Sequence, residues 1–353
     1  MSSCRRVFRA VASVHSVSSP DSRSPETLRL GTLGIAKPWV QAALSGYSDL
    51  AMRRVARAYG AAYALNEVVI DEKVLQRGKG RQRILFVPDD DHPVGGQLMG
   101  STPGRFAQAA NDLVEAGYDV VDINFGCPVG KVLGRCRGGY LLGQPALAID
   151  IVLRVVDAVR DRVPVTLKMR RGLSDDPKSE GAFFEILDGA FAAGISAVTV
   201  HGRTVDQKYE GVSSRAFLKR VKAHAGSRTV LGSGDLFSAQ DVHSMLRDTG
   251  VDGVTIARGA IGNPFIFEQC DRVAAGLQPV VPSLAMQANA ISRHLAEALR
   301  IEKDEASALG KTRRHAIQYA RLHPEPVRCR DAWVLMRSRL DFDRVLGELY
   351  AAN

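Results

Sequence analysis

The sequence predicts an α/β fold, a TIM (β/α)8 barrel followed by a small all-α C-terminal domain. Short apolar segments alternate with amphipathic helical segments from residue 39 to residue 257, and this rhythm favours a closed parallel barrel. An open, doubly wound sheet is the competing fold, but no G-x-G-x-x-G follows the first strand. Beyond Pro282 the hydrophobic periodicity is helical only, which indicates a separate helical domain.

Eight segments have the short length and apolar composition of buried strands. They cover residues 39–43, 61–69, 94–99, 119–124, 163–169, 196–201, 229–231 and 253–257. The helices expected between them cover residues 49–59, 102–116, 146–160, 215–224 and 238–248, with one more ending near residue 194. Residues 71–92 are polar and basic, so we expect a loop there with a short strand at 84–87. In the tail, helices are expected over 285–303 and 306–319, and again between 328 and 350.

The length of 353 residues suits one barrel of ordinary size and a small second domain. We divide the chain into an N-terminal extension (1–34), a barrel domain (35–280) and a helical domain (281–353). The first 30 residues are rich in serine and arginine, and the first acidic residue is Asp21. A transit peptide, a disordered tail and a start codon placed too far upstream share this composition. The extension is therefore left out of the predicted fold.

Five cysteines stand at positions 4, 127, 136, 270 and 329, an odd number without C-x-x-C spacing. This pattern suggests neither a disulfide framework nor a zinc site, so we expect a cytoplasmic, reducing location and no metal. No run of about 18 apolar residues predicts a membrane span. The net charge of +9 favours polyanionic partners without identifying one. We expect a monomer.

The fourth predicted strand ends at the sequence Phe125-Gly126-Cys127-Pro128, which places Cys127 on a loop just beyond the strand. In a βα barrel, catalytic groups stand at this end of the strands. Lys131, Arg135, Arg137 and the pair Gly138-Gly139 follow, so the loop is cationic and is expected to be mobile. A thiol under such a loop suggests chemistry on a phosphorylated or polyanionic substrate. A buried cysteine in a tight turn is the alternative.

Polar and charged side chains recur at the ends of the third to eighth strands, although the strands themselves are apolar. The residues are Gln97, Asn124, Cys127, Lys168, Arg170, His201, Arg203, Gly234, Asp235, Arg258 and Gly259. Buried charges need partners, so an anionic, hydrogen-bonding ligand explains the set. The turns GSGD (232–235) and ARGAIGN (257–263) follow the seventh and eighth strands, where such barrels usually bind phosphate.

These motifs resemble the tRNA-dihydrouridine synthases, flavin enzymes that reduce uridine in tRNA. The resemblance runs from about Ala42 to the C-terminus through NFGCPVGKV, GGYLL, VTLKMRRG, TVHGRT, GSGD and IARGAIGNPFIF. It implies an FMN-bearing barrel, NADPH as the reductant and a helical domain that holds tRNA. By position, the implied FMN contacts are Gln97, Lys168, His201, Ser233, Gly234, Asp235, Arg258 and Gly259. The residues implied around the target uridine are Asn124, Cys127, Arg170 and Arg203.

Two positions depart from the family pattern. Residues 42–46 read AALSG where APMAG is common, which puts the detailed flavin packing in doubt. Ser233 stands where asparagine is usual, but it keeps a hydroxyl donor and the backbone amides of the turn. We therefore expect phosphate binding to survive.

The expected reaction adds a hydride at C6 and a proton at C5 of uracil, and FMN would supply the hydride. Cys127 is the predicted proton donor, because a thiol is mostly protonated near neutral pH. Lys168 and Arg170 alternate by two along one strand and so face the same side, where a cation stabilises developing negative charge. A structural ion pair is the alternative for Lys168.

Between Lys311 and Arg339 basic residues outnumber acidic ones, and KTRRHAIQYARLHP mixes arginines with His315 and Tyr319. This mixture favours contacts with RNA phosphates, some stacking on bases, and a tRNA-binding role for Arg313 and Arg314. A small-molecule flavin reductase of the dihydroorotate or dihydropyrimidine type and a non-catalytic RNA-binding protein remain alternatives. The sequence does not identify which uridine is reduced.

Overall fold

The computed structural model describes residues 27–351, in which eight parallel strands close a barrel. The strands are β3 (Trp39–Gln41), β4 (Ala64–Leu65), β6 (Val94–Met99), β7 (Val120–Phe125), β8 (Val165–Arg170), β9 (Ala197–His201), β10 (Thr229–Ser233) and β11 (Gly253–Ile256). Each strand pairs with the next, and β11 pairs with β3 to close the ring. The short β5 (Val69–Ile70) pairs with the end of β6. The predicted TIM barrel is confirmed.

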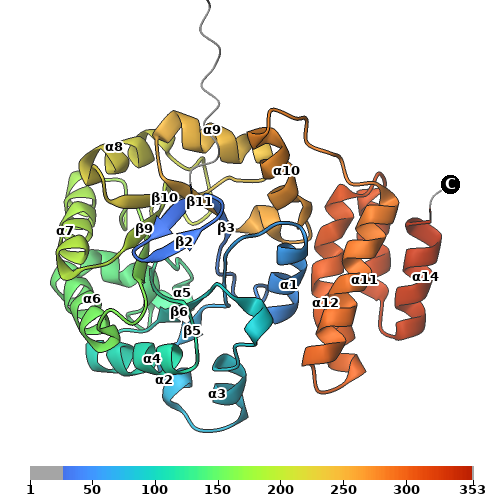
Figure 1. Ribbon diagram of the computed structural model, residues 1–353, viewed down its shortest axis with the longest axis horizontal. Helices are drawn as coiled ribbons and strands as arrows, with labels where there is room; N and C mark the ends of the chain where they lie inside the picture. Colours follow the sequence, from blue (N-terminus) through green and yellow to red (C-terminus); the bar gives the residue numbers. More distant parts are fainter. Residues whose placement is uncertain (1–26, 352–353) are drawn as a thin grey trace, which may run out of the picture.

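A ring of helices surrounds the barrel (Figure 1). The helices are α1 (Leu50–Ala58), α4 (Pro103–Glu115), α6 (Pro145–Val159), α7 (Pro177–Ala193), α8 (Arg215–Ala225), α9 (Ala239–Thr249) and α10 (Phe265–Ala274). Side-chain caps fix several of their first turns: Asp49 accepts the N–H of Met52, and Ser238 forms a capping box with Asp241. Gly194 ends α7 in the left-handed conformation that glycine adopts without a steric penalty.

The amino-terminal end of the barrel is closed by the antiparallel hairpin of β1 (Leu28–Leu30) and β2 (Leu33–Ile35), which lies across its centre in Figure 1. Leu28, Leu30 and Ile35 pack against apolar strand residues, among them Val120 and Leu231. The predicted N-terminal extension therefore ends too late at residue 34, because residues 28–35 bury apolar side chains in the barrel. Residues 1–26 lie outside the described part of the chain.

The segment after β5 differs from the prediction of a loop with a strand at 84–87. It forms α2 (Asp71–Leu75), α3 (Lys79–Ile84) and the 3-10 turn η1 (Asp89–Asp91). The N–H of Leu85 bonds to the carbonyl of Arg81, so residues 84–85 continue a helix and no strand forms. The predicted second strand is divided at Asn66, whose N–H and side chain both bond to the β6 backbone. Its two pieces are β4 and β5.

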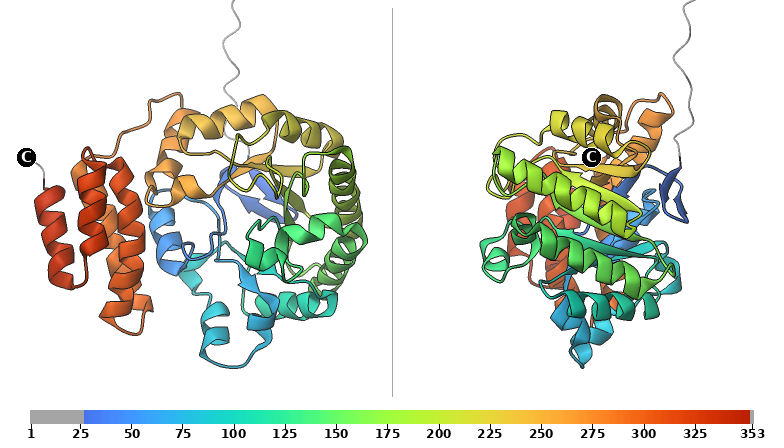
Figure 2. Two further views of the ribbon diagram at one scale, coloured as in Figure 1. Left: turned by 180° about the vertical axis from the view of Figure 1, so that it is seen from behind. Right: turned by 90° about the vertical axis from the view of Figure 1, so that its left-hand side faces the viewer.

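The helical tail consists of α11 (Leu284–Ile301), α12 (Glu305–Tyr319), the turn η4 (Ala320–Leu322), α13 (Pro326–Leu335) and α14 (Arg339–Leu349). It has its own core around Trp333 and Phe342, and this core continues onto Ala51 of α1 and Phe265 of α10. Figure 2 shows the tail as a layer beside the barrel. In the described part of the chain, no helix is both long enough and apolar enough to traverse a bilayer.

Candidate active site

The carboxyl ends of β6 to β10 bring the predicted polar side chains to one end of the barrel. In β8, Leu167 and Met169 join the outer core, so Lys168 and Arg170 lie on the same side of the strand, as predicted, and face the interior. The strand register places Asn124 beside Lys168 and Arg170 beside His201. The interior positions at this end are Gln97, Asn124, Lys168, Arg170, His201 and Ser233.

A chain of buried hydrogen bonds fixes the floor of this site. The Thr166 hydroxyl (2.5 Å) and the Gln97 amide (2.6 Å) both donate to the carboxylate of Asp122. The amide of Asn124 donates to the Gln97 oxygen at 2.6 Å, and the Asn124 oxygen accepts the N–H of Gly126 at 2.9 Å. Burial raises the pKa of Asp122. Because every member is paired, Gln97 and Asn124 are held in one orientation.

Lys168 and His201 have opposite electrostatic characters. Burial and the nearby charge of Arg170 lower the pKa of Lys168 to about 8, so its amine is still largely protonated at neutral pH. That amine makes no hydrogen bond or ion pair with the residues that the structure describes. Burial and the surrounding cations lower the pKa of His201 to about 2, which keeps its ring neutral. An unpaired, partly buried cation beside a neutral imidazole suits an electron-rich ligand.

Cys127 lies two residues beyond β7, half-buried under the following loop, which contains α5 (Gly130–Leu133) and η2 (Gly138–Gly143). Gly138 has a φ of +58°, and a Cβ atom there would lie 2.8 Å from the Cβ of Cys127. The N–H of Gly139 donates to the carbonyl of Cys127 at 3.0 Å. The two glycines therefore let the loop fold directly onto the cysteine.

Arg170 ties this loop to the loop after β9. Its buried guanidinium donates to the carbonyl of Gly126 at 3.0 Å and to the carbonyls of Thr204 and Lys208 at 2.7 Å each. Since Gly126 directly precedes Cys127, the arginine supports the backbone that carries the thiol. A contact between Arg170 and a substrate stays a prediction.

The turns after β10 and β11 lie against each other and carry backbone donors without partners among the described residues. In the described chain, the N–H groups of Gly234, Asp235, Arg258 and Gly259 donate to no protein acceptor. Gly234 and Asp235 have φ values of +113° and +54°, and a Cβ atom on Gly259 would lie 1.9 Å from the carbonyl oxygen of Leu236. Free amides in tight turns form an anion-binding cradle. The side chain of Arg258 stands beside it, over the ring of Tyr209.

Arg203 supports the turn after β10 through an ion pair with Asp235. It pairs with both carboxylate oxygens of Asp235 at 2.8 Å and also donates to the carbonyls of Glu210 and Gly211. Asp235 additionally accepts the N–H of Ser213 at 2.8 Å. The guanidinium is buried, and its donors are engaged within the protein. Its predicted contact with the target uridine remains a prediction, while its positioning of Asp235 is visible.

The basic residues predicted in the tail also have partners. Arg313 donates to the carbonyl of Met336 at 3.1 Å, and Arg314 donates to the carbonyl of Gly46 in the barrel at 2.6 Å. His315 and Tyr319 are each 2% exposed and pack inside the junction between barrel and tail. The prediction that their rings are available to stack on bases is wrong, because they form part of the tail's own core and interface.

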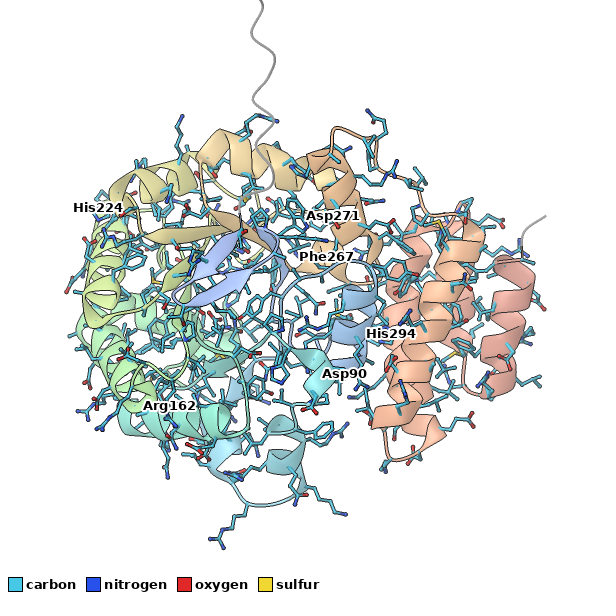
Figure 3. All side chains as sticks on the ribbon, in the orientation of Figure 1. Asp90, Arg162, His224, Phe267, Asp271 and His294 are labelled. Atoms are coloured by element: carbon cyan, nitrogen blue, oxygen red, sulfur yellow. The ribbon has the colours of Figure 1, made fainter. Side chains whose placement is uncertain are left out.

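A cleft of about 1060 Å³ lies between α1, α3 and the tail. Among the charged side chains in its lining, the basic ones outnumber the acidic ones. The basic ones are Arg53, Arg54, Lys79, Arg83, Arg300, Lys303 and Lys311, against the acidic Asp49, Glu67 and Asp90. Figure 3 shows Asp90 on the barrel side of this junction and His294 on the tail side.

Several residues that support the site were not predicted from the sequence. Asp122 is a lone carboxylate inside the apolar strand VVDINF, and that anomaly was visible in the sequence. Asn66, Thr166 and Ser213 had no such signal, because each acts through a partner that is distant along the chain.

Comparison with known proteins matches the chain to dihydrouridine synthases over most of its length. The sequence model of the family described as dihydrouridine synthase (Dus) matches residues 40–338. The chain is 35% identical over 300 residues to tRNA-dihydrouridine synthase B of Xanthomonas campestris pv. campestris, covering 84% of this chain and 88% of that protein. It is 29% identical over 327 residues to the probable tRNA-dihydrouridine synthase of Rickettsia conorii, covering 92% and 97%.

Solved structures support the fold. Histamine dehydrogenase from Rhizobium sp. 4-9 superimposes with a TM-score of 0.57 at 15% identity, over 76% of this chain and 51% of that protein. A 2-naphthoyl-CoA reductase gives a TM-score of 0.54 at 11% identity, over 72% and 52%. The chain thus spans about half the length of these structural neighbours.

Proposed function

The chain belongs to the dihydrouridine synthase family, and from this premise we propose that it reduces the C5=C6 bond of uridine in tRNA as a flavin-dependent oxidoreductase. One arrangement carries the proposal. Cys127 stands at the end of β7, the cationic Lys168 at the end of β8, and the amide cradle follows β10 and β11. The site thus combines a proton donor, a charge stabiliser and an anion site at one end of a barrel.

The residues present fit FMN. The free amides of Gly234, Asp235 and Gly259, with Arg258 beside them, suit one phosphate group. The unpaired amine of Lys168 suits the electron-rich edge of a flavin ring. The resemblance implies NADPH as the reductant. When bound, FMN supplies hydride transfer from NADPH to C6 of the uracil ring.

The chain's own groups complete the reduction. The thiol of Cys127 donates the proton that C5 requires, and the loop folded over it limits access of water. Asn124 donates one amide N–H to Gln97, and its second amide N–H can donate to the uracil edge. The ammonium of Lys168 offers a positive charge that stabilises negative charge on the reduced flavin or on the uracil carbonyl. Hydride and proton together convert uracil into 5,6-dihydrouracil.

The helical tail contributes to binding of the RNA backbone. Reaching a stacked base requires its extrusion from the RNA, and the enzyme must hold the backbone meanwhile. Seven basic and three acidic side chains line the cleft between α1, α3 and the tail, and this excess of positive charge suits RNA phosphates. We therefore assign residues 281–353 to tRNA binding and residues 28–280 to catalysis, with the barrel beginning at the β1–β2 hairpin.

The test uses purified full-length protein with NADPH and unmodified tRNA. We expect about one FMN per chain, oxidation of NADPH that depends on tRNA, and dihydrouridine in the product. Recovery of FAD, or of no flavin in several preparations, would contradict the cofactor. Equal reduction of free pyrimidines without tRNA would instead indicate a small-molecule reductase.

A further inference from the structure

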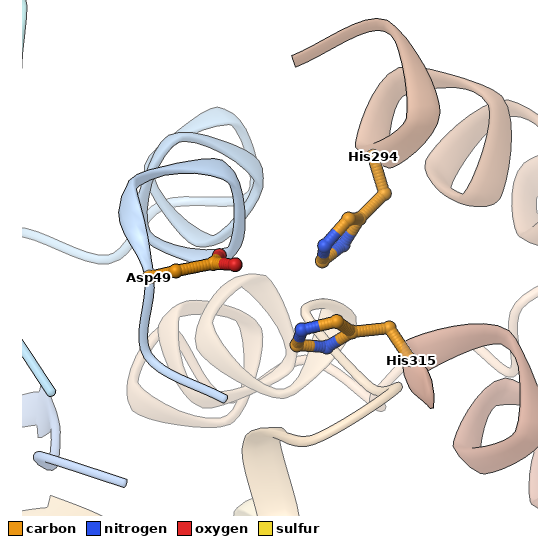
Figure 4. A group of neighbouring side chains, drawn as sticks. All are labelled: Asp49, His294 and His315. Atoms are coloured by element: carbon orange, nitrogen blue, oxygen red, sulfur yellow. The ribbon is translucent and has the colours of Figure 1, made fainter. Parts of the chain in front are cut away.

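Three side chains from three helices converge at the junction between barrel and tail (Figure 4). Asp49 is the N-cap residue of α1, His294 lies on α11, and His315 lies on α12. One potential ligand atom of each lies within 4.8 Å of those of the other two. In Figure 4 the carboxylate and both imidazole rings point toward a common centre.

The three groups face one another without direct hydrogen bonds among them. His294 is 2% exposed, and its Nε2 atom is buried with no partner among the described residues. Its ring centroid lies 4.0 Å from that of His315, with the rings tilted by 37°. A buried polar atom without a partner is destabilising, so its presence points to a further atom at the centre.

The charges at the junction are compatible with a cation there. One oxygen of Asp49 accepts the N–H of Met52, and the other lies 3.4 Å from the ammonium of Lys311. Lys311 pairs more closely with Glu302, at 2.8 Å. It therefore keeps a partner when the second oxygen of Asp49 binds a cation.

We propose that Asp49, His294 and His315 form a binding site for a divalent transition metal, with zinc as the ion of best fit. Two imidazole nitrogens and one carboxylate oxygen are a donor set that Zn²⁺ accepts, with water as a fourth ligand. Calcium and magnesium prefer oxygen donors throughout. Small side-chain rotations would bring the three ligand atoms from their present spacing to a metal.

The position of the site suggests a structural role. The ligands come from one helix of the barrel ring and two helices of the tail. A bound ion would therefore crosslink the barrel and the helical tail. The predicted FMN and uridine contacts within the barrel do not include these three residues. The proposal is thus independent of the proposed redox chemistry, although Asp49 also lines the cleft assigned to tRNA.

The test uses flavin-loaded full-length protein that has been stripped with a chelator and then titrated with Zn²⁺ or Co²⁺. We expect about one ion per chain by equilibrium dialysis, visible d–d bands with Co²⁺, and no sulfur-to-cobalt charge-transfer band. His294→Gln and His315→Gln should bind more than about 100-fold more weakly, since even outer-shell changes cost 10–100-fold. Asp49→Asn should also bind weakly, while asparagine preserves the helix cap.

His243→Gln is the matched control, because His243 is a half-buried helix histidine that bonds to the carbonyl of Cys270 instead. It should bind zinc as the wild type does. Melting temperatures without metal show whether each variant folds, and zinc should raise the melting temperature only where the site is intact. A crystal soaked in zinc should show anomalous density between the three side chains. Density for water only, equal binding by the His294 and His243 variants, or a sulfur charge-transfer band would overturn the proposal.

Discussion

At the level of single residues, the site depends on two groups with different surroundings. Cys127 is covered by glycines and carried by backbone that Arg170 supports. Lys168 is a cation without a protein partner in the described chain, beside a histidine that stays neutral. The first is suited to proton donation and the second to stabilising charge.

Cys127→Ala should lower turnover on the order of 100-fold or more, because the variant lacks the thiol that we propose as the general acid. Flavin content and tRNA affinity should remain those of the wild type. Cys136→Ala is the control, since Cys136 is exposed on the same loop and should be dispensable. Single-turnover reduction of tRNA measures the effect, and a near-normal rate in Cys127→Ala would place the proton donor elsewhere.

Lys168 gives a pH dependence. Its pKa of about 8 means that the amine is protonated below that pH and neutral above it. The affinity of flavin-free protein for FMN, followed by fluorescence quenching, should therefore fall as the pH rises through about 8. Lys168→Arg should bind FMN with an affinity that is constant across this range, because arginine stays charged. The same decline in both proteins would assign the titration to another group.

At the level of elements, the loop after β7 depends on its glycines. Gly138→Ala would place a methyl group 2.8 Å from the Cβ of Cys127 at a φ of +58°. We expect turnover to fall about 100-fold, as for a misplacement of about 1 Å, with flavin binding unchanged. In Gly130→Ala, within the same loop, the new methyl group would meet nothing within 4 Å. Equal rates for the two variants would show that the packing of the loop on Cys127 is not needed.

Regular elements were predictable where a local pattern determines them. The alternation in VTLKMR placed Lys168 and Arg170 on one face, and Asp49 marked the start of α1. Residues 71–92 were mispredicted because their polar, basic composition does not reveal that Arg81 reaches Val74 and Asp112 from a helix. Likewise, the occupied donors of Arg203 depend on residues 7 to 32 positions away, which no local pattern encodes.

At the level of the whole molecule, the sequence predicted a helical and basic tail. It did not predict how the tail packs against the barrel. His315 and Tyr319 looked like RNA contacts because the sequence does not show which face of α12 meets the barrel. Arg314 likewise bonds to Gly46, so reversing its charge would disturb the junction as well as any RNA contact. The cleft beside α3 offers cations better suited to a test.

Arg300→Glu combined with Lys303→Glu should weaken tRNA binding, because both side chains line the cleft and are 71% and 82% exposed. Each lost phosphate contact should reduce the slope of log K against log salt by about 0.7 to 0.9. Flavin content and its reduction by NADPH should not change. The control reverses Arg154 and Arg160 on and beside α6, away from the tail (Figure 1). If both double variants bind tRNA equally well, the cleft is not the tRNA-binding site.

The central claim is that this chain makes dihydrouridine in tRNA. The most direct measurement is to map dihydrouridine, by mass spectrometry of each tRNA, in cells that lack the gene. We predict that dihydrouridine disappears from at least one position, that the wild-type gene restores it, and that Cys127→Ala does not. An unchanged dihydrouridine map in the deletion strain would contradict the account.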